Sequence, residues 1–578
     1  MGNNNRKNNN HKSFFFEDYS VSETIFNNEN TKIPKVSSNR ITFLFFIFFS
    51  LIVIFSIKII YLSLFPEKNF IKTSSNAFIK ERADIVDRNG VILARNINVY
   101  RAGIKPKFIK HKKKFLINLK LNFPEVDIDN VKKKINRGNF FYILNNRLTE
   151  EEKDKIWSLG LGNKILDLEE KQYRVYPQKN LFSHVLGQTD DSNLGISGVE
   201  KFFDKNLKNK NLINSSLILS LDSNLQYLIR EQLLKSQLDF NHVGSAAILM
   251  DVQNGEILSL VSLPDYDLNQ RNSIEDDIYT NKITLGVYEL GSVFKTFTLA
   301  AALENKIVNS DTIFKNLESS LTCDKYTITE HDKLPKNLSA EQILIRSSNI
   351  GSVRLAQKLG TKKYKDFLNS LELLEKINFE LDEVGTPIPF RLGKCKLATT
   401  SYGHGITTTP LQLAKAYAIL SNGGYKIKPS ILKKTNNIEA NRQKIISNET
   451  SSKINSILRN VVSLDEGTAN FANIEGYEVA GKTGTAVKYK SKEKLNTFVS
   501  LFPANRPKYV LLVMLDEPKA EPDFIYEFSP SEKFPNGYKH KGETRNTSGW
   551  NTVVVAGKIR EKIGPILAIN NLEASKNF

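Results

Sequence analysis

An uncharged and strongly apolar run near the N-terminus is the feature that most limits what this chain can fold into. Residues 41–57 contain only Ile, Phe, Leu, Val, Ser and Thr, and apolar character resumes after Lys58 as far as Phe65. Crossing the hydrocarbon core of a bilayer takes about 20 residues of helix, so Lys58 must extend its ammonium toward the headgroups for this segment to suffice. We therefore expect one transmembrane helix over residues 41–65.

The flanks of this run favour an uncleaved anchor over a cleaved signal peptide. Forty mostly polar residues precede it, and no Ala-x-Ala-like site follows it. The Asn-rich residues 1–40 show no period that would bury a core, which predicts a disordered cytoplasmic tail. Lysines or arginines lie on both sides of the run, so the positive-inside rule leaves its orientation open.

Charge and cysteine content restrict the classes of partner and site. The formal net charge is +19, but the lysines are scattered, so we do not expect nucleic acid as a partner. The same charge suits an anionic membrane surface or envelope polymer. Cys323 and Cys395 lack the spacing of metal ligands, so we expect no metal site. From this spacing we assign no disulfide, and whether the two cysteines pair stays open.

A length of 578 residues allows two or three domains. After the anchor, the pattern of apolar residues changes once, near Asp222. Apolar runs around Asn89-Gly90 predict a β-hairpin within residues 81–94, and Thr149-Glu-Glu-Glu152 predicts a capping box on a short helix. Near Asp222 a strand ends and leucines begin to recur at helical spacing. We therefore expect an α+β domain over residues 66–222 and a second domain over residues 223–568.

The second domain has the pattern of an antiparallel sheet with a helical insertion between its strands, which is an α+β design. One predicted hairpin joins residues 246–252 to 257–263, and another joins residues 497–502 to 509–515. A helix with Pro410 in its first turn lies between them. Stretches rich in Ser, Lys and Glu at residues 436–453 and 520–545 are predicted to be surface loops.

Ser292-Val-Phe-Lys295 opens an apolar run that predicts a buried helix. A spacing of three places the two polar side chains on one face, so the amine can approach the hydroxyl and act as its base. Burial would favour the neutral amine, and backbone N–H groups at the helix start would stabilise developing negative charge. The competing reading is a capping serine with a lysine that extends to solvent.

Two further strings add polar groups of complementary chemistry. Ser347-Ser-Asn349 could relay a proton and bind a substrate amide, although an ordinary polar turn has the same pattern. Lys482-Thr-Gly-Thr485 is typical of a strand that pairs with a peptide. The upstream Gly476 also gives this string the formal spacing of a P-loop, but β-type residues fill the intervening positions.

Each string is short enough to recur by chance. Ser-x-x-Lys recurs at Ser491, and Ser-x-Asn recurs at Ser37 and Ser74. These copies fall in a charged loop, in the tail and in the segment next to the membrane. We therefore expect only the set that begins at Ser292 to converge.

Together the strings resemble the transpeptidase domain of penicillin-binding proteins, and the similarity extends along the whole second domain. Similar stretches are Leu219-Ser-Leu-Asp-Ser-Asn-Leu-Gln226, Met250-Asp-Val-Gln-Asn-Gly-Glu-Ile257, Tyr288-Glu-Leu-Gly-Ser292, Gly403-His-Gly405, Thr409-Pro-Leu-Gln-Leu-Ala414, Glu466-Gly-Thr-Ala469 and Val479-Ala-Gly-Lys-Thr-Gly-Thr-Ala486. The resemblance implies an antiparallel sheet with helices on both sides and an all-helical subdomain. His404 lies between two of these glycines, and we expect it to be a loop or packing residue.

The preceding domain narrows the class. Its stretches Arg82-Ala-Asp-Ile-Val-Asp-Arg-Asn-Gly90, Arg174-Val-Tyr-Pro177, His184-Val-Leu-Gly187 and Gly195-Ile-Ser-Gly-Val-Glu200 resemble the elongated α+β pedestal, or dimerisation-type, domain of class B members. Ala83 stands where the family usually has Gly, and Leu290 where it has Pro. A domain of about 150 residues leaves no room for the glycosyltransferase of class A members. Size and the context of Pro410 favour the division type, with the elongation type as the alternative.

The resemblance implies a role for each residue of the three strings. Ser292 would attack the D-Ala-D-Ala bond of a peptidoglycan stem peptide, Lys295 would take its proton, Ser347 would help to move that proton, and Asn349 would hold the acyl chain. Lys482 and Thr483 would bind the terminal carboxylate. Gly484 would let the substrate backbone approach, and the backbone N–H groups of Ser292 and Thr485 would form the oxyanion hole. An amine on a neighbouring strand would complete a 4,3-type cross-link without metal or cofactor.

The resemblance also implies partners and a location. β-Lactams would acylate the same serine, and the septal lipid-linked glycan polymerase and other divisome proteins would bind the chain. The protein would cross the bacterial inner membrane once, with a short cytoplasmic N-terminus and a large periplasmic part. Two other classes stay open: a hydrolase, either a D,D-carboxypeptidase or a β-lactamase, and a non-catalytic scaffold or β-lactam sensor.

Overall fold

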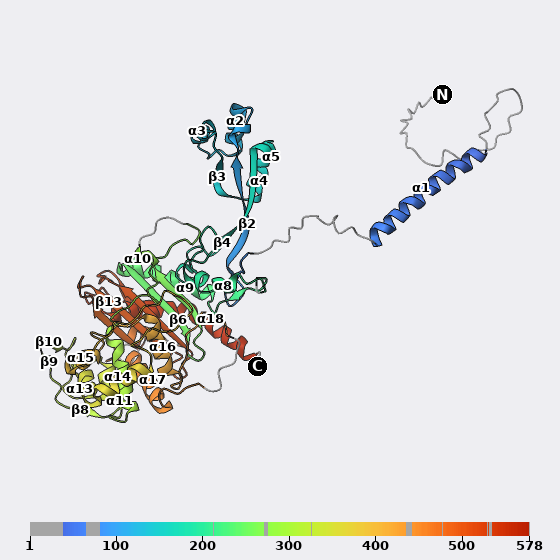
Figure 1. The fold of residues 1–578 in the computed structure, drawn as a ribbon. Helices are drawn as coiled ribbons and strands as arrows, with labels where there is room; N and C mark the ends of the chain where they lie inside the picture. The colour runs from blue at the N-terminus through green and yellow to red at the C-terminus, as the bar shows by residue number, and fades with distance from the viewer. Residues whose placement is uncertain are drawn as a thin grey trace, which may run out of the picture. The chain divides into compact units, whose positions relative to one another are not determined.

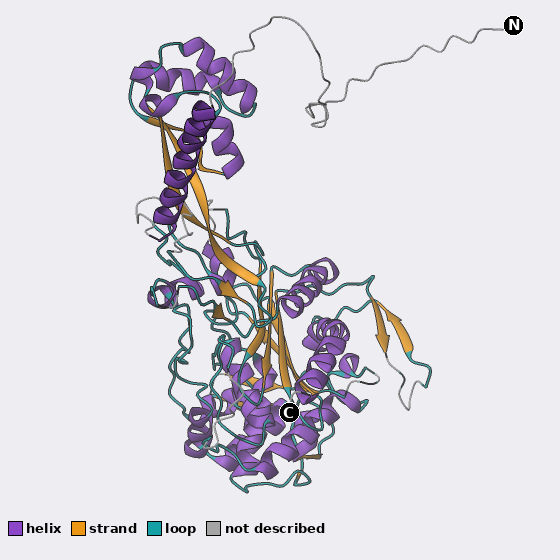
Figure 2. Ribbon diagram, turned by 90° about the vertical axis from the view of Figure 1, so that its right-hand side faces the viewer, coloured by secondary structure: helices purple, strands orange, loops and turns teal. Residues whose placement is uncertain are grey.

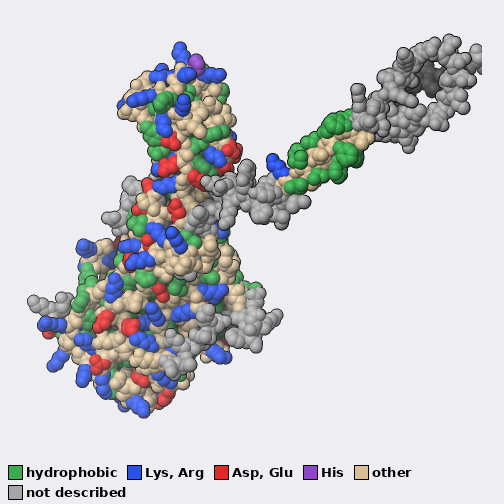
Figure 3. All heavy atoms as spheres, turned by 45° about the vertical axis from the view of Figure 1, so that its right-hand side comes forward, with side chains coloured by type: hydrophobic (Ala, Val, Ile, Leu, Met, Phe, Trp, Pro, Cys, Tyr) green, Lys and Arg blue, Asp and Glu red, His purple; other side chains and the backbone are tan. Residues whose placement is uncertain are grey.

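The computed structural model describes residues 38–64, 81–211, 213–270, 276–324, 326–434, 442–474, 476, 478–528, 530 and 535–576. Helix α1 (Ser38–Leu64) covers the predicted membrane span and begins three residues earlier than expected. An 18-residue stretch of α1, Thr42–Ile59, is apolar enough to cross a bilayer and has none of its surface buried in the protein. Figure 3 shows apolar side chains along this helix. Most of the predicted tail, residues 1–37, lies outside the described residues, as does Phe65.

A five-stranded sheet forms the domain that follows. Its long strand β2 pairs along its length with β4, at its start with β1 and at its end with β3, while β1 also pairs with β5. The strands are β1 (Ile85–Val86), β2 (Ile92–Ile104), β3 (Phe141–Leu148), β4 (Leu166–Val175) and β5 (Leu217–Ile218). The hairpin predicted at Asn89-Gly90 is confirmed as the turn between β1 and β2, where Gly90 has a φ of +86°.

One end of β2 carries a small hydrophobic core of its own, which we call the head (Figure 1). Helices α2 (Lys112–Asn122), α3 (Ile128–Arg137) and α4 (Glu150–Trp157) contribute its buried residues, together with β2, β3 and β4. The predicted capping box is confirmed: Thr149 and Glu152 exchange hydrogen bonds at the start of α4. The head core shares no buried residue with the main core of the protein.

At the other end of β2, three of the class B stretches meet in a buried ion cluster. Arg82 donates to Glu200 at 2.6 Å, and Arg174 donates to the other carboxylate oxygen of Glu200 at 2.7 Å. All three side chains have 0% exposure. Because an unpaired buried charge is costly, this cluster requires all three stretches to come together.

The second domain is built on a five-stranded antiparallel sheet in the order β12-β13-β14-β6-β7. The strands are β6 (Gly244–Asp251), β7 (Ile257–Leu263), β12 (Ala480–Val487), β13 (Lys494–Phe502) and β14 (Tyr509–Asp516). Both predicted hairpins are confirmed, since β6 pairs with β7 and β13 with β14. Strand β12 stands at the edge of the sheet and so retains one side for other contacts.

Two groups of helices cover this sheet, as Figure 2 shows. Helices α9 (Ser223–Phe240) and α18 (Thr552–Lys576) pack on each other and on β7, β13 and β14. Helices α16 (Pro410–Ser421) and α17 (Asn448–Ser463) form the other group and pack on β6, β12, β13 and β14. The predicted start of a domain near Asp222 coincides with the N-cap of α9, where the Asp222 carboxylate accepts the N–H groups of Asn224 and Leu225.

A helical insertion joins the second group and carries much of the site. It comprises α11 (Lys295–Glu304), α12 (Ala340–Ile345), α13 (Asn349–Leu359), α14 (Thr361–Ser370) and α15 (Lys394–Thr400). Two loop predictions were wrong in part. Helix α17 begins at Asn448, and strands β15 (Ile525–Phe528) and β16 (Tyr538–Lys541) form a hairpin within residues 520–545.

The structure pairs the two cysteines, to which the sequence assigned no disulfide. Cys323, at the end of strand β9 (Ser320–Cys323), bonds to Cys395 in α15. The two lie 72 residues apart in sequence, yet their Cα atoms are 5.5 Å apart. Sequence spacing could not reveal this contact because folding of the helical insertion creates it.

Candidate active site

The predicted nucleophile lies in a short 3₁₀ turn, η3 (Gly291–Phe294), directly before α11. The Lys295 N–H donates to the Ser292 carbonyl, which closes a turn of three residues. With three residues per turn, side chains at positions i and i+3 lie one above the other. A 3₁₀ turn, and not the first turn of an α-helix, therefore places Ser292 and Lys295 on one face. Among the described residues no hydrogen bond joins the Lys295 amine to the Ser292 hydroxyl, since the amine donates to Ser347.

Lys295 is almost fully buried, with 1% exposure. Desolvation lowers the pKa of its ammonium to about 7, although the nearby Glu330 carboxylate opposes that shift. A substantial fraction of the lysine is thus neutral near physiological pH, as a general base requires. The Nζ atom donates to the Ser347 carbonyl and, at 3.1 Å, to the Ser347 hydroxyl.

Ser347 lies between α12 and α13 with a φ of +59°, a left-handed conformation that costs a non-glycine residue free energy. Its hydroxyl accepts from Lys295 at 3.1 Å and from Lys482 at 3.0 Å. Two donors occupy both lone pairs of this oxygen, so its own proton is directed elsewhere. The geometry therefore gives Ser347 one proton to donate and two lysines from which to regain it.

Lys482 lies on β12 and is fully buried. Its Nζ also contacts the carbonyl oxygen and hydroxyl of Thr483, at 3.2 and 3.3 Å. Burial and the charge of Lys295 hold the pKa of Lys482 well below its usual value. The β-strand around Lys482 excludes the P-loop alternative, because a P-loop lysine opens a helix.

Two glycines allow η3 to lie against β12. A Cβ on Gly484 would stand 2.2 Å from the Leu290 carbonyl oxygen, and one on Gly291 would stand 2.4 Å from the Thr485 carbonyl oxygen. The space at Gly484 thus receives the segment that carries the nucleophile, whereas we had expected a substrate backbone there. This contact places Gly291, the residue before Ser292, against Thr485. The backbone N–H groups of Ser292 and Thr485 are the two expected donors to an oxyanion.

Asn349 is the first residue of α13, and only the amide nitrogen of its side chain makes a hydrogen bond. Its Nδ2 donates to the Thr329 carbonyl at 2.8 Å. Its Oδ1 is buried and has no hydrogen-bond partner among the described residues. A buried acceptor of this kind is suited to an incoming N–H, because leaving it unpaired costs free energy.

Sequence reasoning missed Glu330, which follows strand β10 (Tyr326–Thr329). Its carboxylate accepts from the Ser348 hydroxyl at 2.6 Å and from the backbone N–H groups of Asn349 and Ile350 at 2.7 and 3.0 Å. A lone glutamate after a short strand has no motif, so the sequence carried no signal for this role.

The recurrent patterns do not join the site. Ser491 lies in the connection between β12 and β13 and is exposed. Its hydroxyl donates to the Glu517 carboxylate. Ser37 and Ser74 lie outside the described residues. His404 lies in the loop before α16, and its side chain is 47% exposed. Its Nδ1 lies 3.3 Å from a carboxylate oxygen of Glu289.

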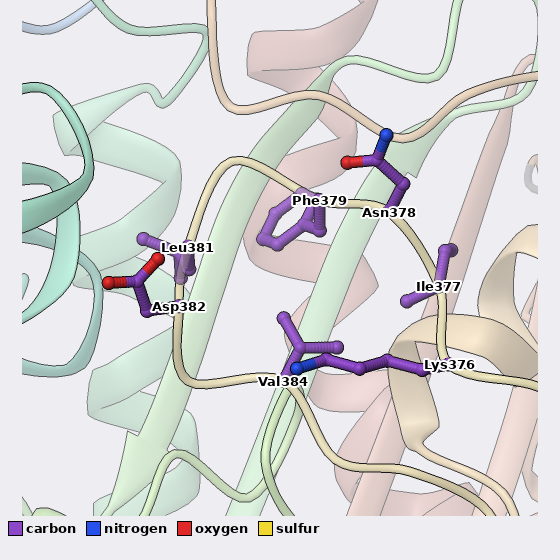
Figure 4. Close-up of a pocket in the computed structure, with 7 residues that line it drawn as sticks. All are labelled: Lys376, Ile377, Asn378, Phe379, Leu381, Asp382 and Val384. Carbon is purple, nitrogen blue, oxygen red and sulfur yellow. The ribbon is translucent and has the colours of Figure 1, made fainter.

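A separate hollow of about 370 Å³ lies along residues 376–384 and contains none of the site residues (Figure 4). Phe379 and Val384 point into the curve of this loop, whereas Asp382 points away from it. Asp382 lies 3.2 Å from Lys201, and Glu383 accepts the Gly198 N–H at 3.2 Å. The loop thus connects the two domains and takes no part in the site.

Comparisons with known proteins identify the family of this chain. Residues 80–218 match the penicillin-binding protein dimerisation domain, and residues 245–529 match the penicillin-binding protein transpeptidase domain. The probable peptidoglycan D,D-transpeptidase FtsI of Caulobacter vibrioides is 30% identical over 84% of this chain and 82% of its own. This chain is a class B penicillin-binding protein. It is accordingly a peptidoglycan D,D-transpeptidase, whose domain implies peptide substrates and β-lactam binding.

Other similar proteins extend the comparison. The peptidoglycan D,D-transpeptidase FtsI of Buchnera aphidicola is 32% identical over 86% of this chain and 93% of its own. Stage V sporulation protein D of Bacillus subtilis is 30% identical over 77% and 76%. The crystal structure of penicillin-binding protein 3 from Mycobacterium tuberculosis aligns with a TM-score of 0.61 at 21% identity, over 85% of this chain and 96% of its own, and shows the shared fold. The N-terminal helix α1 is consistent with the single membrane anchor of this class.

Proposed function

We propose that this class B enzyme cross-links stem peptides at the division septum through an acyl-enzyme on Ser292. The observation that carries the catalytic part is the sharing of the Ser347 hydroxyl by Lys295 and Lys482 beside the turn that holds Ser292. Ser292 lies three residues before Lys295 in this turn, and Ser347 links Lys295 to Lys482 by hydrogen bonds.

In acylation, the neutral Lys295 amine takes the proton of Ser292 as its oxygen attacks the carbonyl carbon of the penultimate D-Ala. The N–H groups of Ser292 and Thr485 stabilise the oxyanion. When the C–N bond breaks, Ser347 donates its proton to the leaving D-Ala amine and regains one from a lysine. The hydroxyl of Thr483 and the amine of Lys482 bind the terminal carboxylate, and the free Oδ1 of Asn349 accepts a substrate N–H.

In deacylation, the amine of a neighbouring stem peptide attacks the ester carbon. Lys295 takes the proton that this amine loses, a C–N bond forms, and the C–O bond to Ser292 breaks. Ser292 regains its proton from Lys295, so the cycle closes without a metal or cofactor. In a hydrolase, water would take the place of the amine.

Ser292 acylation is tested by labelling the full chain with fluorescent penicillin and mapping the adduct by mass spectrometry. We expect one stable adduct, on the peptide that contains Ser292, and none in Ser292→Ala. A label on Ser491 would overturn the assignment. Rapid release of the label would favour a hydrolase, and normal cross-linking in cells that carry Ser292→Ala would favour a scaffold or sensor.

The proposal of a septal role is supported by the similarity to the FtsI relatives. The partners that we propose for this role are the septal glycan polymerase and other divisome proteins. We place the N-terminus in the cytoplasm and the catalytic domain outside the membrane, because the substrate lies there and a disulfide persists in an oxidising compartment. Depletion of the protein should give filamentous cells. In undepleted cells, a fluorescent fusion of the protein should lie at midcell. Rounded cells would favour the elongation type.

A further inference from the structure

A single carboxylate organises the start of α13, the helix that begins at Asn349. The first N–H groups of a helix lack partners within it, and here Glu330 accepts from Asn349 and Ile350. Glu330 also accepts the hydroxyl proton of Ser348, whose oxygen in turn accepts the Gly351 N–H at 2.9 Å. All three residues after Ser347 are thus tied to Glu330 directly, and Gly351 is tied through Ser348.

The residue before Glu330 orients the side chain that faces the substrate. The Thr329 carbonyl holds the Nδ2 of Asn349 at 2.8 Å, which leaves Oδ1 as the buried and unpaired end. Thr329 is also the last residue of β10, paired with Ser320 of β9. The end of one hairpin therefore fixes both the backbone and the carboxamide of this motif.

Glu330 is also the negative charge that acts on the buried Lys295. Its carboxylate is the charge that opposes the desolvation of Lys295. The other charged or titratable groups that interact with Lys295 are Lys482 and His331, and neither supplies negative charge. Without Glu330, two buried amines would face each other with less compensation.

We propose that Glu330 is a positioning residue of the reaction: it holds Ser347, Ser348 and Asn349 in register with Lys295 and balances the charge of that buried lysine. This role rests on the proposed acylation of Ser292. It does not require Glu330 to touch the substrate.

The test is the rate constant of acylation by fluorescent penicillin between pH 5 and 9, measured on the full-length Glu330→Gln protein. Loss of the carboxylate removes a charge that raises the pKa of Lys295, so the amine becomes neutral at lower pH. We expect the rising limb of the profile to move down by about one pH unit. Misplacement of Ser347 and Asn349 should lower the plateau roughly tenfold to a hundredfold.

Glu318→Gln is the matched control. Glu318 also approaches α13, but through an exposed ion pair with Arg354 at 3.8 Å, and exposed pairs contribute little. Its profile should equal that of the unmodified protein.

The proposal would be overturned if the rising limb of the pH profile stayed in place in Glu330→Gln and the acylation rate fell only as much as the amount of folded protein. Should this variant fail to fold, Glu330→Asp takes its place. The shorter side chain holds its charge farther from Lys295, so the limb should move in the same direction by less, and an unshifted limb again overturns the proposal. Failure of the proposed function is distinct, since it would appear as a label that survives in Ser292→Ala.

Discussion

Two buried lysines that share one serine hydroxyl cannot both stay charged at low cost. Burial lowers the pKa of each, and the charge of Lys295 lowers that of Lys482 further. The consequence is a site that holds a neutral amine beside the Ser347 hydroxyl at ordinary pH. Burial, which no spacing in the sequence fixes, is the main cause of this state.

The acylation rate of the unmodified protein should therefore depend on pH through Lys295. The base acts only when neutral, so the rate constant should be level above pH 7 and fall by about tenfold per pH unit well below it. Labelling with fluorescent penicillin under pseudo-first-order conditions would measure this. A profile that is flat from pH 5 to 9 would contradict the assigned base.

Gly484 offers a second test, because a side chain there has no room. Gly484→Ala would drive a methyl group against the Leu290 carbonyl and displace the turn that holds Ser292. We expect acylation to fall by about a hundredfold. Gly393→Ala is the control, since a Cβ at that position meets nothing within 4 Å and its φ is −90°. Equal rates for the two variants would show that the close contact does not matter.

Individual elements were predictable to different degrees, for physical reasons. Apolar runs identified β6, β7, β13 and β14, with Asn254-Gly255 between the first pair and Asn505-Arg-Pro507 between the second. Strand pairs with buried faces carry their register in the sequence. The turn that holds Ser292 was predicted as α-helix, since four residues are too few to separate a period of 3.0 from one of 3.6. The role of Glu330 could not be foreseen, because it depends on a hairpin that folds back onto α13.

The hairpin β9–β10 is held at both ends, by the disulfide at Cys323 and by the contacts of Glu330. Closing a loop of 72 residues stabilises the folded state by up to about 4 kcal/mol in the chain-entropy account. Cys323→Ser should therefore lower the melting temperature and slow the acylation of Ser292. Cys395→Ser should have the same effect, and the two changes together should add little. Additive losses would show that each cysteine acts separately.

At the scale of the whole molecule, resemblance in the sequence reached the class and the domain order, which the family comparisons support. It could not reveal that the class B stretches meet in one buried ion cluster at Arg82, Arg174 and Glu200. Nor did it reveal a second hydrophobic core in the head, because a core is a property of packed neighbours.

Separate cores predict separate opening reactions. The head buries a dozen apolar residues, far fewer than the main core, so amides of α2 and α3 should exchange hydrogen faster than those of β6 and β14. Hydrogen–deuterium exchange with peptide mapping would measure this. Equal protection in the two regions would indicate a single cooperative unit.

The strands that leave the head also set how force travels through this enzyme. Strands β2 and β4 pair from Ile104↔Leu166 in the head down to Arg95↔Val175, next to the buried ion cluster. Antiparallel hydrogen bonds resist sliding along such a ribbon, whereas the head shares no core residue with the rest. A protein that pulls or twists the head would therefore transmit that force to the second domain through the paired strands β2 and β4.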